Sequence, residues 1–244
     1  MANDDNNRLG LSLITNFGCD TNCSYCIWNH HPLKKVHGPN NWDKISKIFS
    51  FFPQEKISIS GGGDPLFQFP DVYENWHLKS WYDKLFSICD KKIDIHTSKL
   101  IDDTNFIQKF NKYVLHLDWN RFLENKDKLI DFPISLRLVF VLIPPGNIET
   151  AFYIKEKIET LVKFSEKIDC QLSFREYYHY CRTMTGIEIP RYPDRLETSL
   201  IEYVKSFAKK NKKIHFIKQD DYNIYYMPDD QIYTDFMCRR KPIC

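Results

Sequence analysis

The sequence predicts an α/β protein built as a partial (β/α)6 TIM-like barrel, with a short C-terminal β-hairpin extension. Six short apolar runs alternate with longer segments of helical spacing, which is typical of parallel strands joined by helical crossovers. No residue pattern repeats along the chain, so a solenoid is not indicated. The 244 residues also fall below the length that a complete eight-unit barrel usually needs, about 250 residues. Six units therefore fit best.

The predicted elements follow from local pattern. Segments with helical spacing lie at 71–88, after Pro70, and at 148–168 and 197–210. KIHFI, at 213–217, is a further apolar run, and Pro228-Asp229-Asp230 interrupts alternating apolar residues as a β-hairpin turn would. No linker divides the chain, so we expect one domain over 1–244, with a core over about 9–217 and the extension over 218–244. The six predicted strands span 9–15, 56–60, 91–96, 113–119, 135–143 and 170–176.

Charge and hydropathy exclude several classes of partner. The 34 basic and 32 acidic side chains give a net charge of +2, too little to create a field that favours nucleic acid, a membrane surface or an acidic partner. The start, MANDDNNR, is polar, and no run of apolar residues is long enough to cross a bilayer. We therefore expect a cytoplasmic protein with no membrane partner.

Cysteine clustering gives the first functional signal. The chain has eight cysteines, and in a reducing compartment they are better explained by metal chemistry than by a disulfide framework. Three of them, Cys19, Cys23 and Cys26, fall within GCDTNCSYC after the first predicted strand. Structural zinc sites normally have four protein ligands. Three thiolates can instead hold a [4Fe-4S] cluster with one iron open, and a zinc site or a chance grouping is the alternative.

A glycine-rich stretch follows the second predicted strand. In ISISGGGDPLF the strand leads directly into Gly61, Gly62, Gly63, Asp64 and Pro65. Glycines allow the backbone to come close to a ligand and to expose its N–H and C=O groups. By itself the stretch is equally consistent with an ordinary strand-to-helix turn.

Together the two motifs resemble those of the radical S-adenosylmethionine (radical SAM) superfamily. CDTNCSYC matches the CxxxCxxC pattern, with the aromatic Tyr25 before the third cysteine, and GGGDP is similar to the GGEP motif. Asp64 stands where Glu is commoner, and an extra glycine precedes it. The resemblance implies a [4Fe-4S] cluster on Cys19, Cys23 and Cys26, which reductively cleaves S-adenosylmethionine (AdoMet) to methionine and a 5′-deoxyadenosyl radical. That radical would abstract hydrogen from a small-molecule or nucleoside substrate.

The resemblance also implies partners and leaves alternatives. A flavodoxin or a ferredoxin would serve as the electron donor. An activase that installs a glycyl radical on a partner protein is the second reading, because such enzymes have similar length and the same cysteine spacing. A zinc or electron-transfer module is the third, and it does not account for GGGDP.

Further site residues are expected by the same resemblance. Each has an alternative: Thr97 and Ser98 could cap a strand, Arg175 could lie on the surface, Tyr25 could fill its loop, and Asp118 could cap the next helix. The expected cofactor-binding residues are Tyr25 against the adenine or the cluster, Gly61, Gly62, Gly63 and Asp64 at the amino group of AdoMet, Thr97 and Ser98 near its ribose or carboxylate, and Arg175 at its carboxylate. Asp118, at the end of the fourth strand, is the expected substrate contact and, with Tyr25, a catalytic candidate.

The remaining cysteines give a weaker signal. Cys170, Cys181, Cys238 and Cys244 could hold an auxiliary cluster or metal, although their spacing lacks compact pairs. The alternative is that they are buried or terminal thiols, because Cys behaves as a small apolar residue in protein cores. We expect that role for Cys89, on a predicted helix.

Overall fold

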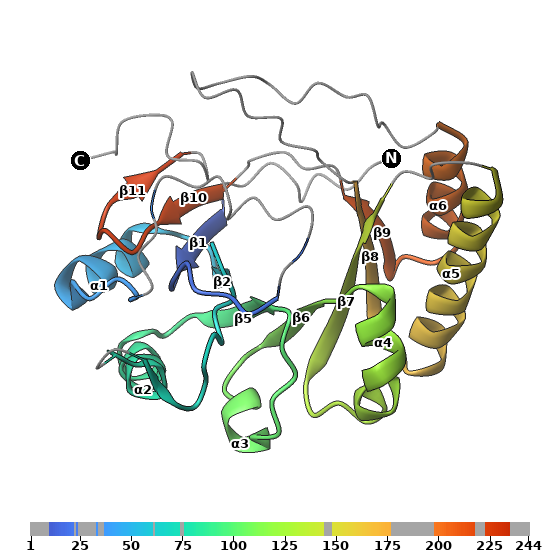
Figure 1. Ribbon diagram of the computed structural model, residues 1–244. Coiled ribbons are helices and arrows are strands. Elements are labelled where there is room, and N and C mark those ends of the chain that lie inside the picture. The colour runs from blue at the N-terminus through green and yellow to red at the C-terminus, as the bar shows by residue number, and fades with distance from the viewer. Residues whose placement is uncertain are drawn as a thin grey trace, which may run out of the picture. The chain divides into compact units, whose positions relative to one another are not determined.

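The computed structural model describes most of the chain. The described residues are 10–21, 23, 33, 37–60, 62–73, 76–143, 148–176, 198–217 and 223–234. They form two compact units, the first comprising Met1–Tyr113 and Asp220–Cys244 and the second comprising Val114–Gln219. Both units are α/β, and their strands are mostly parallel (Figure 1).

The first unit contains five neighbouring strands of the main sheet, in the order β11-β10-β1-β2-β5. Neighbouring strands are parallel except for β10 and β11, which form an antiparallel hairpin. The strands are β1 (Gly10–Ile14), β2 (Lys56–Ser60), β5 (Lys92–Thr97), β10 (Asn223–Tyr226) and β11 (Ile232–Tyr233). The predicted hairpin is therefore confirmed. Its first strand extends the sheet by pairing with β1, which the sequence did not predict.

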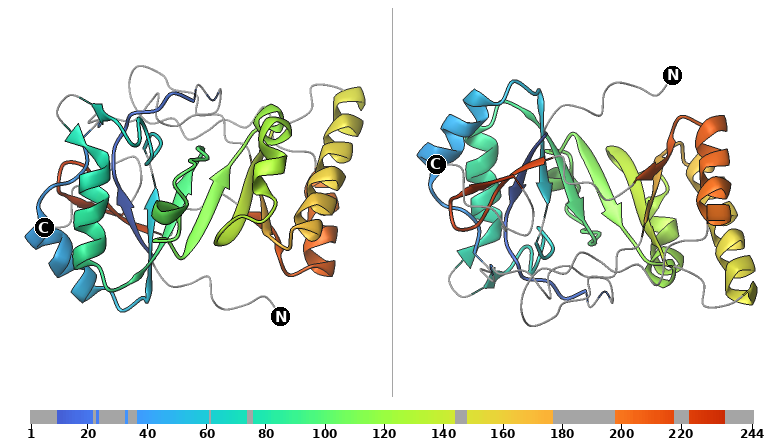
Figure 2. Two further views of the ribbon diagram at one scale, coloured as in Figure 1. Left: turned by 90° about the horizontal axis from the view of Figure 1, so that it is seen from below. Right: turned by 90° about the horizontal axis from the view of Figure 1, so that it is seen from above.

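Helices α1 (Trp42–Phe51) and α2 (Leu78–Ile88) lie next to one another in this unit (Figure 2). The rings of Trp42 and Trp81 meet at a centroid distance of 5.6 Å. The Asn41 side chain caps α1 by accepting a hydrogen bond from the Lys44 N–H. The short helix α3 (Thr104–Ile107) adds Phe106, whose ring packs edge-on against the fully buried Tyr82 ring.

The segment 71–88 departs from its prediction as one helix. Its first part forms a two-stranded antiparallel ladder of β3 (Val72–Tyr73) and β4 (Trp76–His77), and α2 begins only at Leu78. Helix α2 also ends at Ile88, so Cys89 is its C-terminal cap rather than a helical residue. Strands of two residues each are too short to show an alternating pattern in the sequence, which explains the error.

The second unit contains most of β6 and all of β7, β8 and β9, which are neighbours in that order, and β7, β8 and β9 are parallel. Helices α5 and α6 run side by side against β8 and β9 (Figure 1). The predicted helices at 148–168 and 197–210 are confirmed, and so are all six predicted strands, with ends shifted by a few residues. The elements are β6 (Lys112–His116), α4 (Trp119–Asn125), a 3-10 helix η3 (Lys126–Leu129), β7 (Ser135–Leu142), α5 (Ile148–Lys167), β8 (Gln171–Glu176), α6 (Thr198–Lys210) and β9 (Ile214–Ile217).

Candidate functional site

The candidate site lies in the first unit, where the carboxyl ends of β1, β2 and β5 meet. These three strands are adjacent and parallel, with Ile14 opposite Ser60 and Ile59 opposite Ile95. Three segments follow them. We call residues 15–41, between β1 and α1, the thiol loop, and residues 61–71, between β2 and β3, the glycine loop; a turn after β5 begins at Ser98. Loops at the carboxyl ends of parallel strands are the usual place for α/β active sites.

The thiol loop contains two described cysteines in a compact turn. Cys19 and Cys23 are both half-buried. The Thr21 N–H donates to the Cys19 Sγ at 3.3 Å, and the Cys23 N–H donates to the Thr21 carbonyl at 3.0 Å. Thr21 is therefore hydrogen-bonded to both cysteines. Cys26 and Tyr25 lie outside the described residues.

The glycine loop packs directly against the start of the thiol loop. The Gly63 N–H donates to the Asn16 carbonyl at 3.1 Å, and the Asp64 N–H donates to the Gly18 carbonyl at 2.8 Å. In return the Asn16 side-chain amide donates to the Asp64 carbonyl at 3.1 Å, while its oxygen accepts from the Gly18 N–H at 2.8 Å. Asn16 is fully buried, so all these bonds are shielded from water.

The described glycines explain why the two loops can approach so closely. A Cβ on Gly63 would lie 2.0 Å from the Gly18 carbonyl oxygen, and one on Gly62 would lie 1.8 Å from the Phe17 ring. From the sequence, these glycines are expected to make room for a ligand. In the structure they make room for the thiol loop, and their contact with AdoMet stays a prediction. Gly61 lies outside the described residues.

Asp64 connects the glycine loop to the end of β5. One carboxylate oxygen accepts from the Leu66 N–H at 2.8 Å and from the Thr97 hydroxyl at 2.7 Å. The other accepts from the Ser98 N–H at 2.6 Å and from the Ser98 hydroxyl at 2.5 Å. Asp64 is only 2% exposed, so its negative charge is held by these four donors. The predicted residues Asp64, Thr97 and Ser98 are thus brought together, although as partners of one another.

A second set of contacts joins the turn after β5 to the thiol loop. The hydroxyls of Ser98 and Thr21 lie 3.2 Å apart, within hydrogen-bond distance. Outside this pair, the Lys99 ammonium forms a salt bridge of 2.7 Å with the exposed Asp20 carboxylate. The three segments therefore form one continuous hydrogen-bonded structure around Cys19 and Cys23.

Two buried tyrosines support the same structure. The Tyr82 hydroxyl donates to the Pro65 carbonyl at 3.0 Å, and the Tyr113 hydroxyl donates to the Lys99 carbonyl at 2.7 Å. Burial, and then the nearby Asp64 charge, raise the pKa of both phenols well above the ordinary value. Both tyrosines therefore remain neutral hydrogen-bond donors at every physiological pH.

The other predicted residues lie in the second unit. Arg175 is half-buried on β8, opposite Val141 and Ile217 on its neighbouring strands. Asp118 is exposed and caps α4, because its carboxylate accepts from the Arg121 N–H at 2.9 Å. The capping alternative for Asp118 is therefore observed, and a substrate contact there stays a prediction.

The auxiliary metal site stays a prediction. Cys170 is buried, and burial raises the pKa of its thiol to about 12, which is the behaviour of a small core residue. Cys181, Cys238 and Cys244 lie outside the described residues. Within the part of the chain that the structure describes, no group of three or more His, Cys, Asp or Glu side chains is placed to hold a metal ion.

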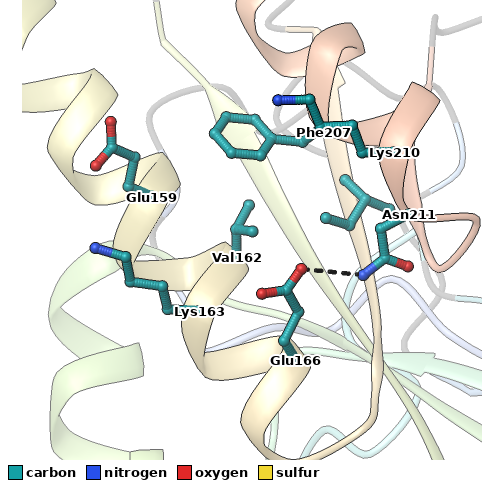
Figure 3. Close-up of a pocket in the computed structure, with 8 residues that line it drawn as sticks. Glu159, Val162, Lys163, Glu166, Phe207, Lys210 and Asn211 are labelled. Carbon is teal, nitrogen blue, oxygen red and sulfur yellow. Dashed lines mark hydrogen bonds between the residues drawn. The ribbon is translucent and has the colours of Figure 1, made fainter.

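The second unit contains a pocket. It occupies about 350 Å³ between α5 and α6 and has no predicted site residue in its lining (Figure 3). Glu166 and Asn211 close one end with a hydrogen bond of 3.2 Å.

Over the described residues, no helix is both long enough and apolar enough to cross a membrane.

Asn16 and Thr21 are the residues that the sequence analysis missed. Both connect loops, and neither has a reactive side chain, although Thr21 lies within the cysteine motif. A signal was present for Asn16, since Thr15 and Asn16 are polar residues that directly follow an apolar strand, and the structure buries both fully. Polar residues at the end of a buried strand must find hydrogen-bond partners, and at this edge those partners are the neighbouring loops.

Comparisons with known proteins place this geometry in a fold. No protein-family model matches the chain, and no curated protein sequence matches it. Two solved structures of anSMEcpe, an anaerobic sulfatase-maturating radical SAM enzyme, are similar to it. The native form with bound AdoMet has a TM-score of 0.60 at 11% identity and covers 96% of this chain and 76% of its own. The histidine-tagged form with bound AdoMet has a TM-score of 0.54 at 14% identity, and the match covers 83% of this chain and 59% of the histidine-tagged chain. The chain therefore shares its α/β fold with these AdoMet-bound radical SAM structures.

Proposed function

We propose that this chain is a radical SAM enzyme. Cys19, Cys23 and Cys26 would hold a [4Fe-4S] cluster, and AdoMet would bind at the iron that they leave open. The observation that carries the proposal is the packing of the thiol loop on the glycine loop at the carboxyl edge of β1, β2 and β5. The shared fold supports it, because both similar structures have AdoMet bound.

The donor set fits such a cluster. Thiolates are the ligands that iron–sulfur clusters prefer, and the two described thiols are half-buried on a loop whose backbone is fixed on both sides of Thr21. Half-burial limits the access of water and oxygen to these thiols. The glycines and Asp64 supply backbone groups at the same edge. A partial barrel over the six parallel strands, as predicted from the sequence, is part of this proposal.

When bound, the cluster supplies one electron that cleaves AdoMet to methionine and a 5′-deoxyadenosyl radical. The residues of the chain would bind and orient the reactants and exclude water. Thr97 and Ser98 already donate to Asp64, so their hydroxyl protons are committed within the protein. We therefore expect these two residues to orient the glycine loop, whose backbone would contact the amino group of AdoMet, and Arg175 to pair with a carboxylate.

The substrate would be a small molecule or a nucleoside, with a flavodoxin or a ferredoxin as electron donor. A second candidate is a protein substrate, which one observation favours: the two similar structures belong to an enzyme that matures a sulfatase. Cross-linking under turnover conditions would separate the two. A cross-linked protein from which the enzyme has abstracted a hydrogen atom would support the second candidate.

The proposal is tested by anaerobic reconstitution with iron and sulfide. The wild type should bind about four irons per chain and show an electron paramagnetic resonance signal that changes when AdoMet is added. Cys23→Ala should lose both properties while keeping its fold. Cys89→Ala is the matched control, because Cys89 lies at the end of α2 and should leave iron content unchanged. A saturated zinc site in place of iron would contradict the proposal.

A further inference from the structure

The C-terminal hairpin contacts both ends of the thiol loop. Its strands β10 and β11 are joined by a turn in which the Asp230 N–H donates to the Met227 carbonyl at 3.0 Å. Asp230 follows Asn40 of the thiol loop by 190 residues in the chain, yet the two are hydrogen-bonded. The hairpin and the thiol loop thus belong to the same compact unit, although they come from opposite ends of the sequence.

At the start of the thiol loop the contact is apolar. Tyr225, Met227 and Tyr233 of the hairpin are buried in one cluster with Ile14 and Phe17. Phe17 comes two residues before Cys19, and its ring fills the space in front of Gly62. Leu33 of the thiol loop also packs against this cluster. The hairpin thus supports the loop on both sides of the cysteines in the sequence.

At the end of the thiol loop the contact is polar. Residues 37–41, which we call the return segment, lead from the thiol loop to α1. The Asp230 carboxylate accepts from the Asn40 N–H at 3.2 Å and from the Asn41 N–H at 3.0 Å. These donors lie at the amino end of α1, where a negative charge is favourable. The Lys44 ammonium donates to the Asp230 carbonyl at 2.7 Å, which adds a third bond to the same residue.

Neighbouring groups hold Asp230 in this position. The Tyr226 hydroxyl donates to the same carboxylate oxygen at 2.8 Å. Burial, and then this hydrogen bond, raise the pKa of Tyr226, so the phenol stays a neutral donor. The return segment is fixed from its other side as well, because the Trp81 indole donates to the Pro39 carbonyl at 2.7 Å.

We propose that the hairpin β10–β11 is a working part of the cluster site, with Asp230 as a positioning residue that fixes the return segment of the thiol loop. The inference rests on the proposed function for the identity of what the loop holds. The contacts that fix the loop are observed whatever the loop holds. A loop that must present three ligands at fixed spacing needs both ends fixed, and here the hairpin contacts both.

Three variants test the inference. Asp230 has a φ of 59°, a left-handed conformation that Gly and Asn tolerate, so neither Asp230→Gly nor Asp230→Asn adds backbone strain. Asp230→Gly removes the carboxylate, whereas Asp230→Asn keeps an oxygen that can accept the same bonds. Asp229→Ala is the matched control, because the described bonds of the Asp229 carboxylate run to Gln231 and Tyr233 within the hairpin.

Hydrogen exchange on the full chain, before any cluster is added, measures the link directly. Asp230→Gly should raise the exchange rate of the Asn40 and Asn41 amides by roughly tenfold or more, as expected for the loss of bonds to a charged acceptor. Asp230→Asn and Asp229→Ala should stay near the wild type at these amides. Should Asp230→Gly fail to fold, Lys44→Ala offers a second test. It removes the bond from the Lys44 ammonium to the Asp230 carbonyl and should raise the exchange rate of the Asn40 and Asn41 amides to a smaller extent.

After anaerobic reconstitution, the same variants test the consequence for the cluster. Asp230→Gly should hold less iron and show a smaller AdoMet-induced change of its resonance signal, and Asp230→Asn should restore both. The inference is overturned if Asp230→Gly matches Asp229→Ala in amide exchange, or in iron content and signal. A wild type that binds no cluster would instead overturn the proposed function, while the exchange result would still decide whether the hairpin holds the thiol loop.

Discussion

Replacing Asp64 by Asn should destabilise the first unit strongly. Each carboxylate oxygen accepts one backbone N–H, from Leu66 on one side and from Ser98 on the other. An amide has only one oxygen, so in either orientation its NH2 group faces a backbone donor that cannot turn away. The variant therefore loses at least one charge-assisted hydrogen bond and leaves a buried donor unpaired. The two effects together should cost about 3–5 kcal/mol.

Urea unfolding, followed by tryptophan fluorescence, measures this cost. Asp94→Asn is the matched control. Asp94 lies on β5, and its carboxylate accepts a hydrogen bond from the side-chain amide of Asn111 at 2.6 Å. A side-chain amide can rotate to suit the new acceptor. The control should cost less than about 1 kcal/mol. Equal stabilities of Asp64→Asn and Asp94→Asn would refute the view that Asp64 joins the three segments of the site.

Two further predictions concern packing and pH. Gly63→Ala should lower the free energy of unfolding by about 3 kcal/mol, because its Cβ would meet the backbone of Gly18. Gly10→Ala should lower it by less than about 1 kcal/mol, because its Cβ would meet only the side chain of Asn223, at 2.9 Å. Equal unfolding midpoints of the two variants would contradict this prediction. Burial raises the pKa of the Cys170 thiol to about 12, so the folded chain keeps a proton that the unfolded chain releases above about pH 8.5. Between these values the wild type should lose stability relative to Cys170→Ala by up to about 1.4 kcal/mol per pH unit, and parallel pH profiles of the two proteins would count against a buried thiol.

Strand and helix positions were largely predictable because they depend on local patterns. SLRLVFVLI was predicted as a strand because most of its residues are apolar, and the helix that begins at Ile148 was predicted from apolar residues at helical spacing. The prediction of one helix over 71–88 was wrong in its first part. Strands β3 and β4 pair over only two residues each, and so short a ladder leaves no periodic signal in the sequence.

Contacts within the site were less predictable because they depend on register. The sequence analysis named Asp64, Thr97 and Ser98 as separate cofactor contacts. That they bind one another follows from the pairing of β2 with β5, which places Ile59 opposite Ile95 and so brings the two strand ends together. Nothing local in the sequence sets that register. The pairing of β10 with β1 was unpredictable for the same reason.

The most direct test of the proposed function is the cleavage of AdoMet. The wild type, reconstituted anaerobically and reduced with a strong low-potential reductant, should form 5′-deoxyadenosine and methionine in equal amounts, measured by mass spectrometry. Cys23→Ala should form neither above background. A wild type that carries a full cluster and yet forms no more 5′-deoxyadenosine than Cys23→Ala would contradict the account.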